Sequence, residues 1–312
     1  MAPVNPKLSY HVPVLVSEAI QYLITDPSGL YVDATLGGGG YSEIILSSLN
    51  DRGRVIGIDR DSEAIEFAAR RLSLYADRLT LVHSDFGGID EVFDHHHVNS
   101  IDGIVFDLGV SSHQIDEPER GFSYLTDGPL DMRMNQKDKL TAWDVVNTYS
   151  REDLADLFYY YGEERHARRY ARYLAEAREK NPIQTTRELA ECVKKWTSPN
   201  WQIKTLSRLF QAIRIEVNGE LKQLEDALVK SGRVLKPGGR IVVVTYHSLE
   251  AKVVKRFVRG EIGQSQNTET IYGSDSEFKQ ITKKAVAPSD DEVKSNTRAR
   301  SAYLRVIEKK AA

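Results

Sequence analysis

The first third of the chain alternates short apolar runs with amphipathic stretches. Apolar runs of this length, bounded by turn residues, predict buried strands, and apolar positions three and four residues apart predict helices. The predicted strands span 31–34, 55–58, 79–83 and 104–107, and the predicted helices between them span 41–49, 62–75 and 88–93. Ser62, with Glu63 in the first turn, is the predicted N-cap of the second helix. The alternation indicates a parallel sheet covered by helices on both faces.

The alternation stops near residue 111 and returns near residue 220. Residues 111–135 are polar and rich in turn-forming residues, and loops of this length are usually functional or disordered. Residues 140–217 predict helices and no strand. Afterwards the pattern predicts a helix at 220–234, a strand at 240–245, a helix at 249–258 and a strand at 302–307. We expect an α/β domain built from residues 1–127 and 205–312, with an inserted all-helical domain at 128–204.

The turn after the first predicted strand carries the strongest functional signal. Four consecutive glycines, Gly37 to Gly40, follow that strand, and glycine permits positive φ and a close approach of backbone to a ligand. A strand, a glycine turn and a helix form the first half of a nucleotide-binding βαβ unit. The next predicted strand ends in Asp59. An acid about 20 residues after such a turn usually accepts hydrogen bonds from a ribose diol.

The details of this turn favour S-adenosylmethionine (SAM) over a dinucleotide. Ser42 stands where the pattern GxGxxG requires its third glycine, whereas DxGxGxG, found in SAM methyltransferases, fits Asp33, Gly37 and Gly39, with Thr35 replacing the first glycine. Residues 235–244, LKPGGRIVVV, form a helix–PGG–strand connection that is typical of the same enzymes and unusual in dehydrogenases. A nicotinamide-dependent oxidoreductase and a tight turn without any ligand are the alternatives.

Further candidate residues follow the third and fourth strands. Asp85 and Phe86 lie at the carboxyl edge of the sheet, where open α/β folds bind ligands. There an acid can accept from an adenine amine, and an aromatic ring can lie against the base. Asp107 ends the fourth strand at the same edge. Many amino-methyltransferases continue with Asp/Asn-Pro-Pro-aromatic, but this chain continues Leu108-Gly109-Val110, so the residues alone do not assign the methyl acceptor.

Composition and charge limit the class of partner. Of the 312 residues, 41% are hydrophobic and 28% are charged, which is typical of a globular protein. A net charge of −3 does not suggest a general polyanion binder, so any nucleic-acid surface must be a local basic patch. One helical stripe, a candidate phosphate surface, consists of Arg165, Arg168, Arg169 and Arg172. A solvated helix face is an equally good interpretation of this stripe. Three residues are interpreted as anchors of helix packing rather than base-stacking platforms: Trp143, Trp196 and Trp201.

No feature of the chain indicates secretion, a membrane or a metal. The single cysteine, Cys192, excludes an internal disulfide and a cysteine-only metal site, which suits a reducing compartment. The N-terminal residues lack the basic start and apolar core of a signal peptide, and no apolar run approaches the length needed to span a bilayer. We therefore expect a cytoplasmic protein without a membrane segment or a metal cofactor.

A set of longer motifs runs in a fixed order along nearly the whole chain. They read HVPVL, DATLGGGGYS, GIDRD, FDLGVSSHQID, ERGFS, GPLDMRM, YGEERHARR, FQAIRIEVN, LKPGGR, YHSLE and NTRARSAYLR. DLGVSS followed by RGFS and GPLDMRM is the most specific part, because generic methyltransferases lack it. In this order the motifs resemble the bacterial ribosomal RNA small subunit methyltransferase H family, which has a Rossmann-like class I SAM-dependent methyltransferase fold.

The resemblance implies an activity, a cofactor and a partner. It implies SAM-dependent methylation of N4 of a cytidine in the decoding centre of 16S ribosomal RNA, with the small ribosomal subunit as partner. The α/β domain would bind SAM, and the helical domain would recognise the substrate. SAM contacts are implied at Gly39, Gly40, Tyr41, Asp59, Phe86, Asp107 and Gln114. The family usually has histidine where this chain has Tyr41, and the sequence is compatible with a homodimer.

The acceptor chemistry leaves alternatives open. Asp107 is the best-placed acid to accept a hydrogen bond from the N4 amine, although the resemblance assigns it to SAM. Ser111, Ser112 and the edge Tyr246-His247-Ser248 are its rivals for this role. A methyltransferase acting on another RNA or DNA amine, or on a small molecule, is the main alternative function. A non-catalytic RNA-binding module is a further one, which the intact glycine turn and Asp59 argue against.

Overall fold

The computed structural model describes residues 13–262 and 276–311, so His11 and Val12 of the first motif lie outside the described residues. The chain divides into two compact units. The first, here called the sheet unit, comprises Met1–Gly109 and Leu221–Ala312, and the second, the helical unit, comprises Val110–Glu220. The expected insert, 128–204, lies within the helical unit.

Within the described residues, the sheet unit is built on seven strands in the order β3-β2-β1-β4-β5-β7-β6. The strands are β1 Leu30–Asp33, β2 Arg54–Asp59, β3 Leu79–His83, β4 Ile101–Asp107, β5 Leu235–Thr245, β6 Phe278–Gln280 and β7 Tyr303–Lys309. Strands β1 to β5 are parallel, and β7 is antiparallel to both β5 and β6. The first five positions follow the Rossmann order 3-2-1-4-5, whose order reverses between β1 and β4. The predicted Rossmann-like fold class is confirmed.

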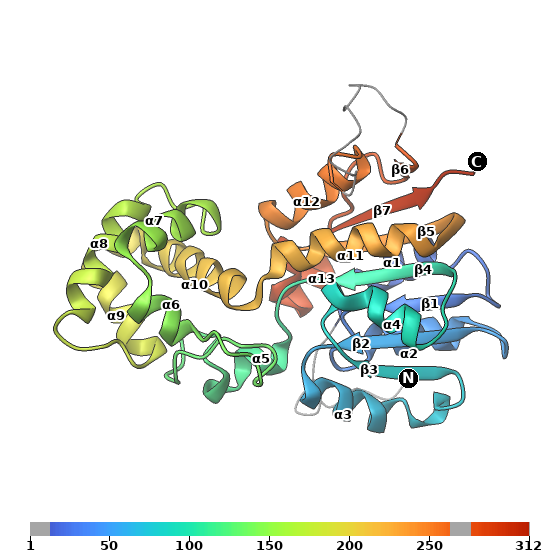
Figure 1. The fold of residues 1–312 in the computed structure, drawn as a ribbon, viewed down its shortest axis with the longest axis horizontal. Helices are drawn as coiled ribbons and strands as arrows, with labels where there is room; N and C mark the ends of the chain where they lie inside the picture. The colour runs from blue at the N-terminus through green and yellow to red at the C-terminus, as the bar shows by residue number, and fades with distance from the viewer. Residues whose placement is uncertain (1–12, 263–275, 312) are drawn as a thin grey trace. The chain divides into compact units, whose positions relative to one another are not determined.

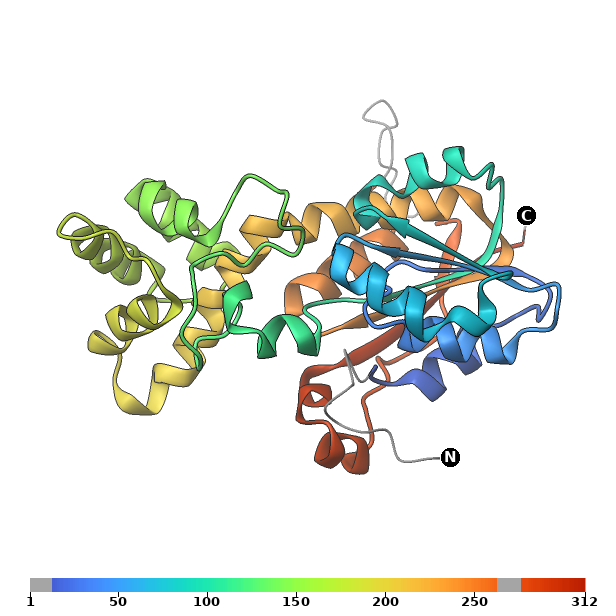
Figure 2. The same cartoon turned by 90° about the horizontal axis from the view of Figure 1, so that it is seen from below.

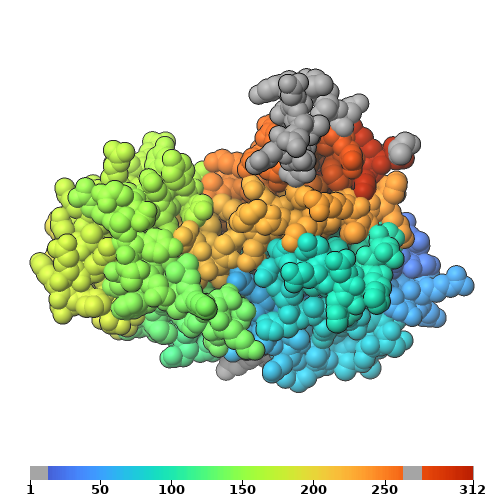
Figure 3. Space-filling model, viewed as in Figure 1, coloured from blue at the N-terminus to red at the C-terminus, as the bar shows by residue number. Residues whose placement is uncertain are grey.

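Helices cover both faces of this sheet because successive strand residues alternate between two apolar clusters. Tyr31 packs with α1 and α2, whereas the next residue, Val32, packs with α4, α11 and α12. The helices of the unit are α1 Val16–Leu23, α2 Gly40–Ser48, α3 Ser62–Arg71, α4 Ile89–His95, α11 Glu220–Val234, α12 Ser248–Val258 and α13 Asp290–Ser295. Figure 1 shows α4 and α11 in front of the sheet, and Figure 2 shows α1 and α2 on the opposite side. In Figure 3 the surfaces of α4 and α11 lie side by side, joined by Lys230 and Asp90 at 2.6 Å.

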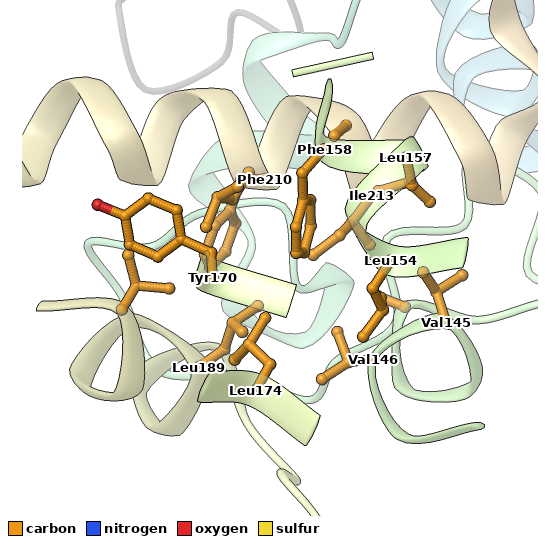
Figure 4. Packing of buried hydrophobic residues seen from close by; sticks show 14 of the residues in the cluster. Val145, Val146, Leu154, Leu157, Phe158, Tyr170, Leu174, Leu189, Phe210 and Ile213 are labelled. Atoms are coloured by element: carbon orange, nitrogen blue, oxygen red, sulfur yellow. The ribbon is translucent and has the colours of Figure 1, made fainter. Parts of the chain in front are cut away.

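The helical unit has its own apolar core. Its helices are α5 Ser112–Asp116, α6 Ala142–Thr148, α7 Arg151–Tyr160, α8 Ala167–Arg178, α9 Thr186–Lys195 and α10 Gln202–Asn218. Thr141, Ser150 and Thr185 begin α6, α7 and α9, and each side chain accepts a hydrogen bond from a backbone N–H of the first turn. Figure 4 shows Phe158 and Phe210 pointing into the same cluster as leucines and valines of the neighbouring helices.

The segment expected to be a long polar loop is held by buried polar contacts. Arg120 is 2% exposed and donates to the Met134 carbonyl at 2.8 Å. Asn218, at the end of α10, accepts from the Met134 N–H at 2.9 Å and donates to the Met132 carbonyl at 2.8 Å. These bonds satisfy backbone groups that no helix or strand serves. No helix among the described residues is both long and apolar enough to cross a membrane.

Candidate active site

The glycine turn joins the end of β1 to α2 in a conformation that requires glycine. Gly37 and Gly39 have φ of +49° and +77°, in the left-handed region. A Cβ at Gly39 would lie 2.8 Å from the Leu72 side chain, so a larger residue would also have to shift that buried leucine. Helix α2 therefore begins immediately after a turn without side chains. This arrangement lets a ligand approach the backbone N–H groups at the N-terminus of the helix.

Asp59, at the end of β2, fixes this turn. Its Oδ2 accepts from the Gly37 N–H at 2.7 Å, and its Oδ1 accepts from the Asp61 N–H at 2.9 Å. Burial raises the pKa of Asp59 to about 6, and the two backbone hydrogen bonds counteract part of this rise. A carboxylate has about four acceptor positions, so these two bonds leave capacity for a ligand's hydroxyl groups.

Asp33, at the end of β1, is a second buried carboxylate of the same edge. It is 0% exposed, and its Oδ2 accepts from the Ser42 hydroxyl of α2 at 2.7 Å. Burial raises the pKa of Asp33 to about 7, the Ser42 hydrogen bond lowers it, and the charges of Asp107 and Asp59 raise it further. Sequence reasoning placed Asp33 in the turn motif but not among the site residues, although a buried acid after a strand was the available signal.

Asp107, at the end of β4, is joined to both neighbouring strands. Its backbone N–H donates to the Thr35 hydroxyl at 2.7 Å, so the residue that replaces a motif glycine links the ends of β1 and β4. Its Oδ1 accepts from the Tyr246 hydroxyl, just after β5, at 2.8 Å. Burial, then the Asp107 charge, raise the pKa of Tyr246. Tyr246 therefore stays protonated and orients the Asp107 carboxylate.

The other expected SAM contacts, Tyr41, Phe86 and Gln114, differ in which of their atoms a ligand could reach. Tyr41 is 3% exposed and its hydroxyl donates to the Val14 carbonyl, so its ring belongs to the core and only its backbone is available to a ligand. Phe86 follows β3, half-buried, with its ring edge-to-face against Phe106 at 6.0 Å. Gln114 belongs to the helical unit, where its Oε1 accepts from the Ser111 N–H at 3.1 Å in the capping box of α5.

The Tyr246-His247-Ser248 edge begins α12. His247 is the N-cap of that helix, and Glu250, which is buried, accepts from the Tyr246 N–H at 2.6 Å and the His247 N–H at 3.1 Å. The His247 Nε2 lies 3.1 Å from the Glu250 Oε1. These contacts explain why the letters YHSLE occur together: they position Tyr246, and through it Asp107.

The helical unit carries a basic groove of about 790 Å³ between α7 and α8. Three of the four stripe arginines line it, together with Arg151, and Arg165 is not one of its lining residues. The lining residues are Arg151, Glu152, Ala155, Asp156, Arg168, Arg169 and Arg172. Four guanidinium groups against two carboxylates give the groove a local positive charge that the whole chain lacks.

The sequence was interpreted as making all three tryptophans packing anchors, and the structure supports this only for Trp143. Trp143 donates its indole N–H to Gln184 at 3.1 Å and packs partly buried against the core of the unit. Trp196 and Trp201, in contrast, are 43% and 57% exposed. Sequence reasoning missed this because helical spacing does not reveal whether the residue that ends a helix turns inward or outward.

Comparisons with known proteins agree along the whole chain. The sequence pattern of the MraW methylase family matches residues 8–310. A ribosomal RNA small subunit methyltransferase H from Caldicellulosiruptor bescii is 48% identical over 304 residues, covering 96% of this chain and 99% of that protein. The protein of the same name from Carboxydothermus hydrogenoformans is 48% identical over 305 residues, covering 96% and 97%.

Solved structures align less well. An S-adenosylmethionine-dependent O-methyltransferase from Thermotoga maritima aligns with a TM-score of 0.41 at 13% identity, covering 100% of this chain and 68% of that one. At this TM-score the alignment adds nothing to the assignment, which is carried by the family match and by identities well above 30% over almost the full length. The chain belongs to the MraW methylase family.

Proposed function

We propose that this protein uses SAM to methylate N4 of a cytidine in the decoding centre of 16S ribosomal RNA, within the small ribosomal subunit. Its relatives at 48% identity are named ribosomal RNA small subunit methyltransferases, which supports an RNA substrate. The family uses SAM as its methyl donor. The observation that carries the choice of donor is the set of three carboxylates around the glycine turn.

Charge separates SAM from a dinucleotide at this site. Asp33, Asp59 and Asp107 lie close enough for the last two to raise the pKa of the first. Such a cluster repels the pyrophosphate of a nicotinamide dinucleotide, whereas the sulfonium and ammonium groups of SAM are attracted to it. This favours a methyltransferase over the oxidoreductase alternative.

Each expected contact has a specific role in the proposal. The backbone at Gly39, Gly40 and Tyr41 lies against the donor, because no side chain there obstructs it. The Asp59 carboxylate accepts from the ribose diol, and the Phe86 ring lies against the adenine. Gln114 is kept as an expected SAM contact on the family resemblance alone.

Methylation of N4 replaces one of the two N–H hydrogens, so the amine must lose one proton to an acceptor. The cytosine N4 lone pair is conjugated with the ring, so the amine is a poor nucleophile. A carboxylate that accepts a hydrogen bond from N4–H favours pyramidal nitrogen and stabilises the positive charge that develops during in-line attack. We assign this to Asp107, whose carboxylate Tyr246 already orients at 2.8 Å. SAM supplies the electrophilic methyl group.

The helical unit is the proposed substrate-recognition part, with the expected insert 128–204 inside it. Its basic groove suits phosphate groups of RNA. A cytosine must leave its stack to reach a methyl donor, so contacts beyond the target base are needed to hold the surrounding strand.

Methyl transfer from labelled SAM tests the proposal directly. Purified small subunits, protein-free 16S ribosomal RNA and DNA are the substrates, and mass mapping locates the modified base. We expect N4-methylcytidine in the subunit. A methyl group on another RNA position or on DNA would favour the alternative acceptor, and no transfer to any of them would overturn the proposal.

A further inference from the structure

Two residues of α8, the last residue of α9 and the residue that follows it form a layered surface feature, here called the cation–aromatic stack. The rings of Tyr173 and Trp196 are parallel within 15°, with centroids 4.1 Å apart. The Arg172 guanidinium lies 4.9 Å from the Tyr173 centroid, and the Lys195 Nζ lies 5.6 Å from the Trp196 centroid. Although Trp196 already stacks on a ring, 43% of its surface is exposed.

The stack is held in place from beneath. Trp196 ends α9, and the next residue, Thr197, is buried. The Thr197 hydroxyl donates to the Val193 carbonyl at 2.7 Å and lies 2.9 Å from the hydroxyl of Tyr170, which is itself 2% exposed. Because the neighbouring residue is anchored on both sides, the Trp196 ring is presented in a fixed position at little entropic cost.

The stack also continues the basic groove. Arg172 lines the groove and at the same time covers Tyr173. A phosphate chain lying in the groove would therefore bring its bases to the level of the two rings. Exposed aromatic rings flanked by cations are the arrangement with which proteins bind unpaired nucleobases.

We propose that the cation–aromatic stack binds an unpaired nucleobase of the RNA substrate while the arginines of the groove contact the adjoining phosphates. The assignment rests on the proposed function, which supplies RNA as the partner. It goes further by naming a second base contact in the helical unit, apart from the methylated cytosine. An apolar protein surface fits the stack poorly, because docking it would desolvate both flanking cations.

The test compares two labelled oligonucleotides by fluorescence anisotropy. One is an unstructured single-stranded RNA, and the other is an abasic ribose-phosphate chain of the same length and charge. The wild-type protein should bind the RNA more tightly. Trp196→Ala should weaken RNA binding by roughly 5- to 100-fold, because the contact with one stacked base is lost. Binding of the abasic chain and the salt slope should not change, because every phosphate contact is kept.

Two further variants separate stacking from general damage. Trp196→Phe keeps a ring and should retain most of the affinity. Tyr159→Ala removes a ring of α7 that is 58% exposed and contacts Tyr160 edge-to-face, and it should behave as wild type. All variants should keep the wild-type SAM affinity and the wild-type far-UV circular dichroism, which together report that the sheet unit and the helical unit are folded.

The proposal is overturned if Trp196→Ala binds the RNA and the abasic oligonucleotide as the wild type does, or if it loses affinity for both oligonucleotides equally. It is also overturned if the variant methylates protein-free RNA normally and fails only on assembled subunits, because the ring would then contact a protein. A wild-type protein that prefers the base-containing chain but methylates no ribosomal RNA would refute the proposed function and leave the stack as an RNA-binding surface.

Discussion

At the scale of single residues, two buried carboxylates of the sheet unit have raised pKa values. Asp33 has a pKa raised to about 7 and Asp59 a pKa raised to about 6, chiefly because both are buried. A cationic ligand beside them favours their ionised forms and lowers both pKa values again. Ligand binding and proton release are therefore coupled at this site.

SAM binding should release a fraction of a proton near pH 7, and its affinity should rise with pH from about 5 to 8. The free protein binds more protons than the complex in this range, so raising the pH favours the complex. Calorimetry in buffers of different ionisation enthalpy measures the release. Asp33→Asn should remove most of it near pH 7, and an unchanged release would show that Asp33 does not sense the ligand.

Asp59→Asn should weaken SAM binding by roughly 10- to 100-fold, because the amide keeps an acceptor for the Gly37 N–H but lacks the charge that strengthens bonds to the ribose. Asp61→Asn is the matched control. Asp61 caps α3 by accepting from the Glu63 N–H at 3.1 Å, and asparagine caps equally well. Equal affinities in the two variants would remove Asp59 from the ribose site.

Tyr41→Phe should leave SAM affinity unchanged and lower the free energy of unfolding by about 1–3 kcal/mol, because the buried Val14 carbonyl loses its donor. Urea denaturation measures the second effect and calorimetry the first. A large loss of SAM affinity without a loss of stability would contradict the placement of the ring in the core.

Some residue roles could be predicted from sequence and others could not. The ends of β1, β2 and β4 carry acids, and parallel topology alone brings strand ends together. The N-cap of α3 was predicted one residue late, since Asp61 rather than Ser62 accepts from the first turn. Either residue type caps well, so only backbone conformation decides between them.

At the scale of elements, α7 and α8 create a charged surface that neither helix has alone. Arg151 and Ala155 come from α7, whereas Arg168 and Arg172 come from α8. The sequence showed the stripe on α8, because its spacing is local. The facing residues on α7 depend on how the two helices pack, which spacing does not reveal.

Replacing both Arg168 and Arg169 by glutamine should weaken binding of the RNA substrate and lower the salt slope by about one to two, with SAM affinity unchanged. The control Lys180→Gln with Arg187→Gln removes the same charge from exposed positions of the helical unit that do not line the groove. Binding measured across a salt series distinguishes them. Equal effects of the two double variants would mean that only net charge matters.

The segment 111–135 shows where prediction from sequence ends at this scale. Its polar composition indicated a loop. The structure holds it through Asn218, which is 84 residues away in sequence from its partner Met134. Contacts of such separation leave no periodic signal, so the fixed conformation could not be read from the segment itself.

At the scale of the whole molecule, a net charge of −3 coexists with a local basic groove. The protein therefore lacks the long-range field that captures bare RNA, and it depends on short-range contacts in fixed register. A folded target presents its phosphates and bases in such a register before binding.

The boundaries of the two units, in contrast, follow from packing, which is why 110 and 220 differ from the positions 128 and 204 suggested by composition.

Assembled small subunits should be methylated faster than protein-free 16S ribosomal RNA at matched salt, because less order must be imposed on the RNA during binding. Initial rates with labelled SAM measure the difference, with SAM held at saturation for both substrates. Equal or faster methylation of the free RNA would contradict this prediction while leaving the cytidine N4 assignment in place.

Gly109, the last residue of the first part of the sheet unit, has a φ of +95° and lies only two residues after Asp107. The covalent path from the proposed proton acceptor to the helical unit is thus shorter than a single helical turn. Glycine is the residue that can rotate there at least cost. A residue with a Cβ would be strained at this φ, and the strain would fall on the peptide next to Leu108, directly beside Asp107. The sequence around Asp107 is therefore constrained by backbone conformation as well as by the chemistry of its carboxylate.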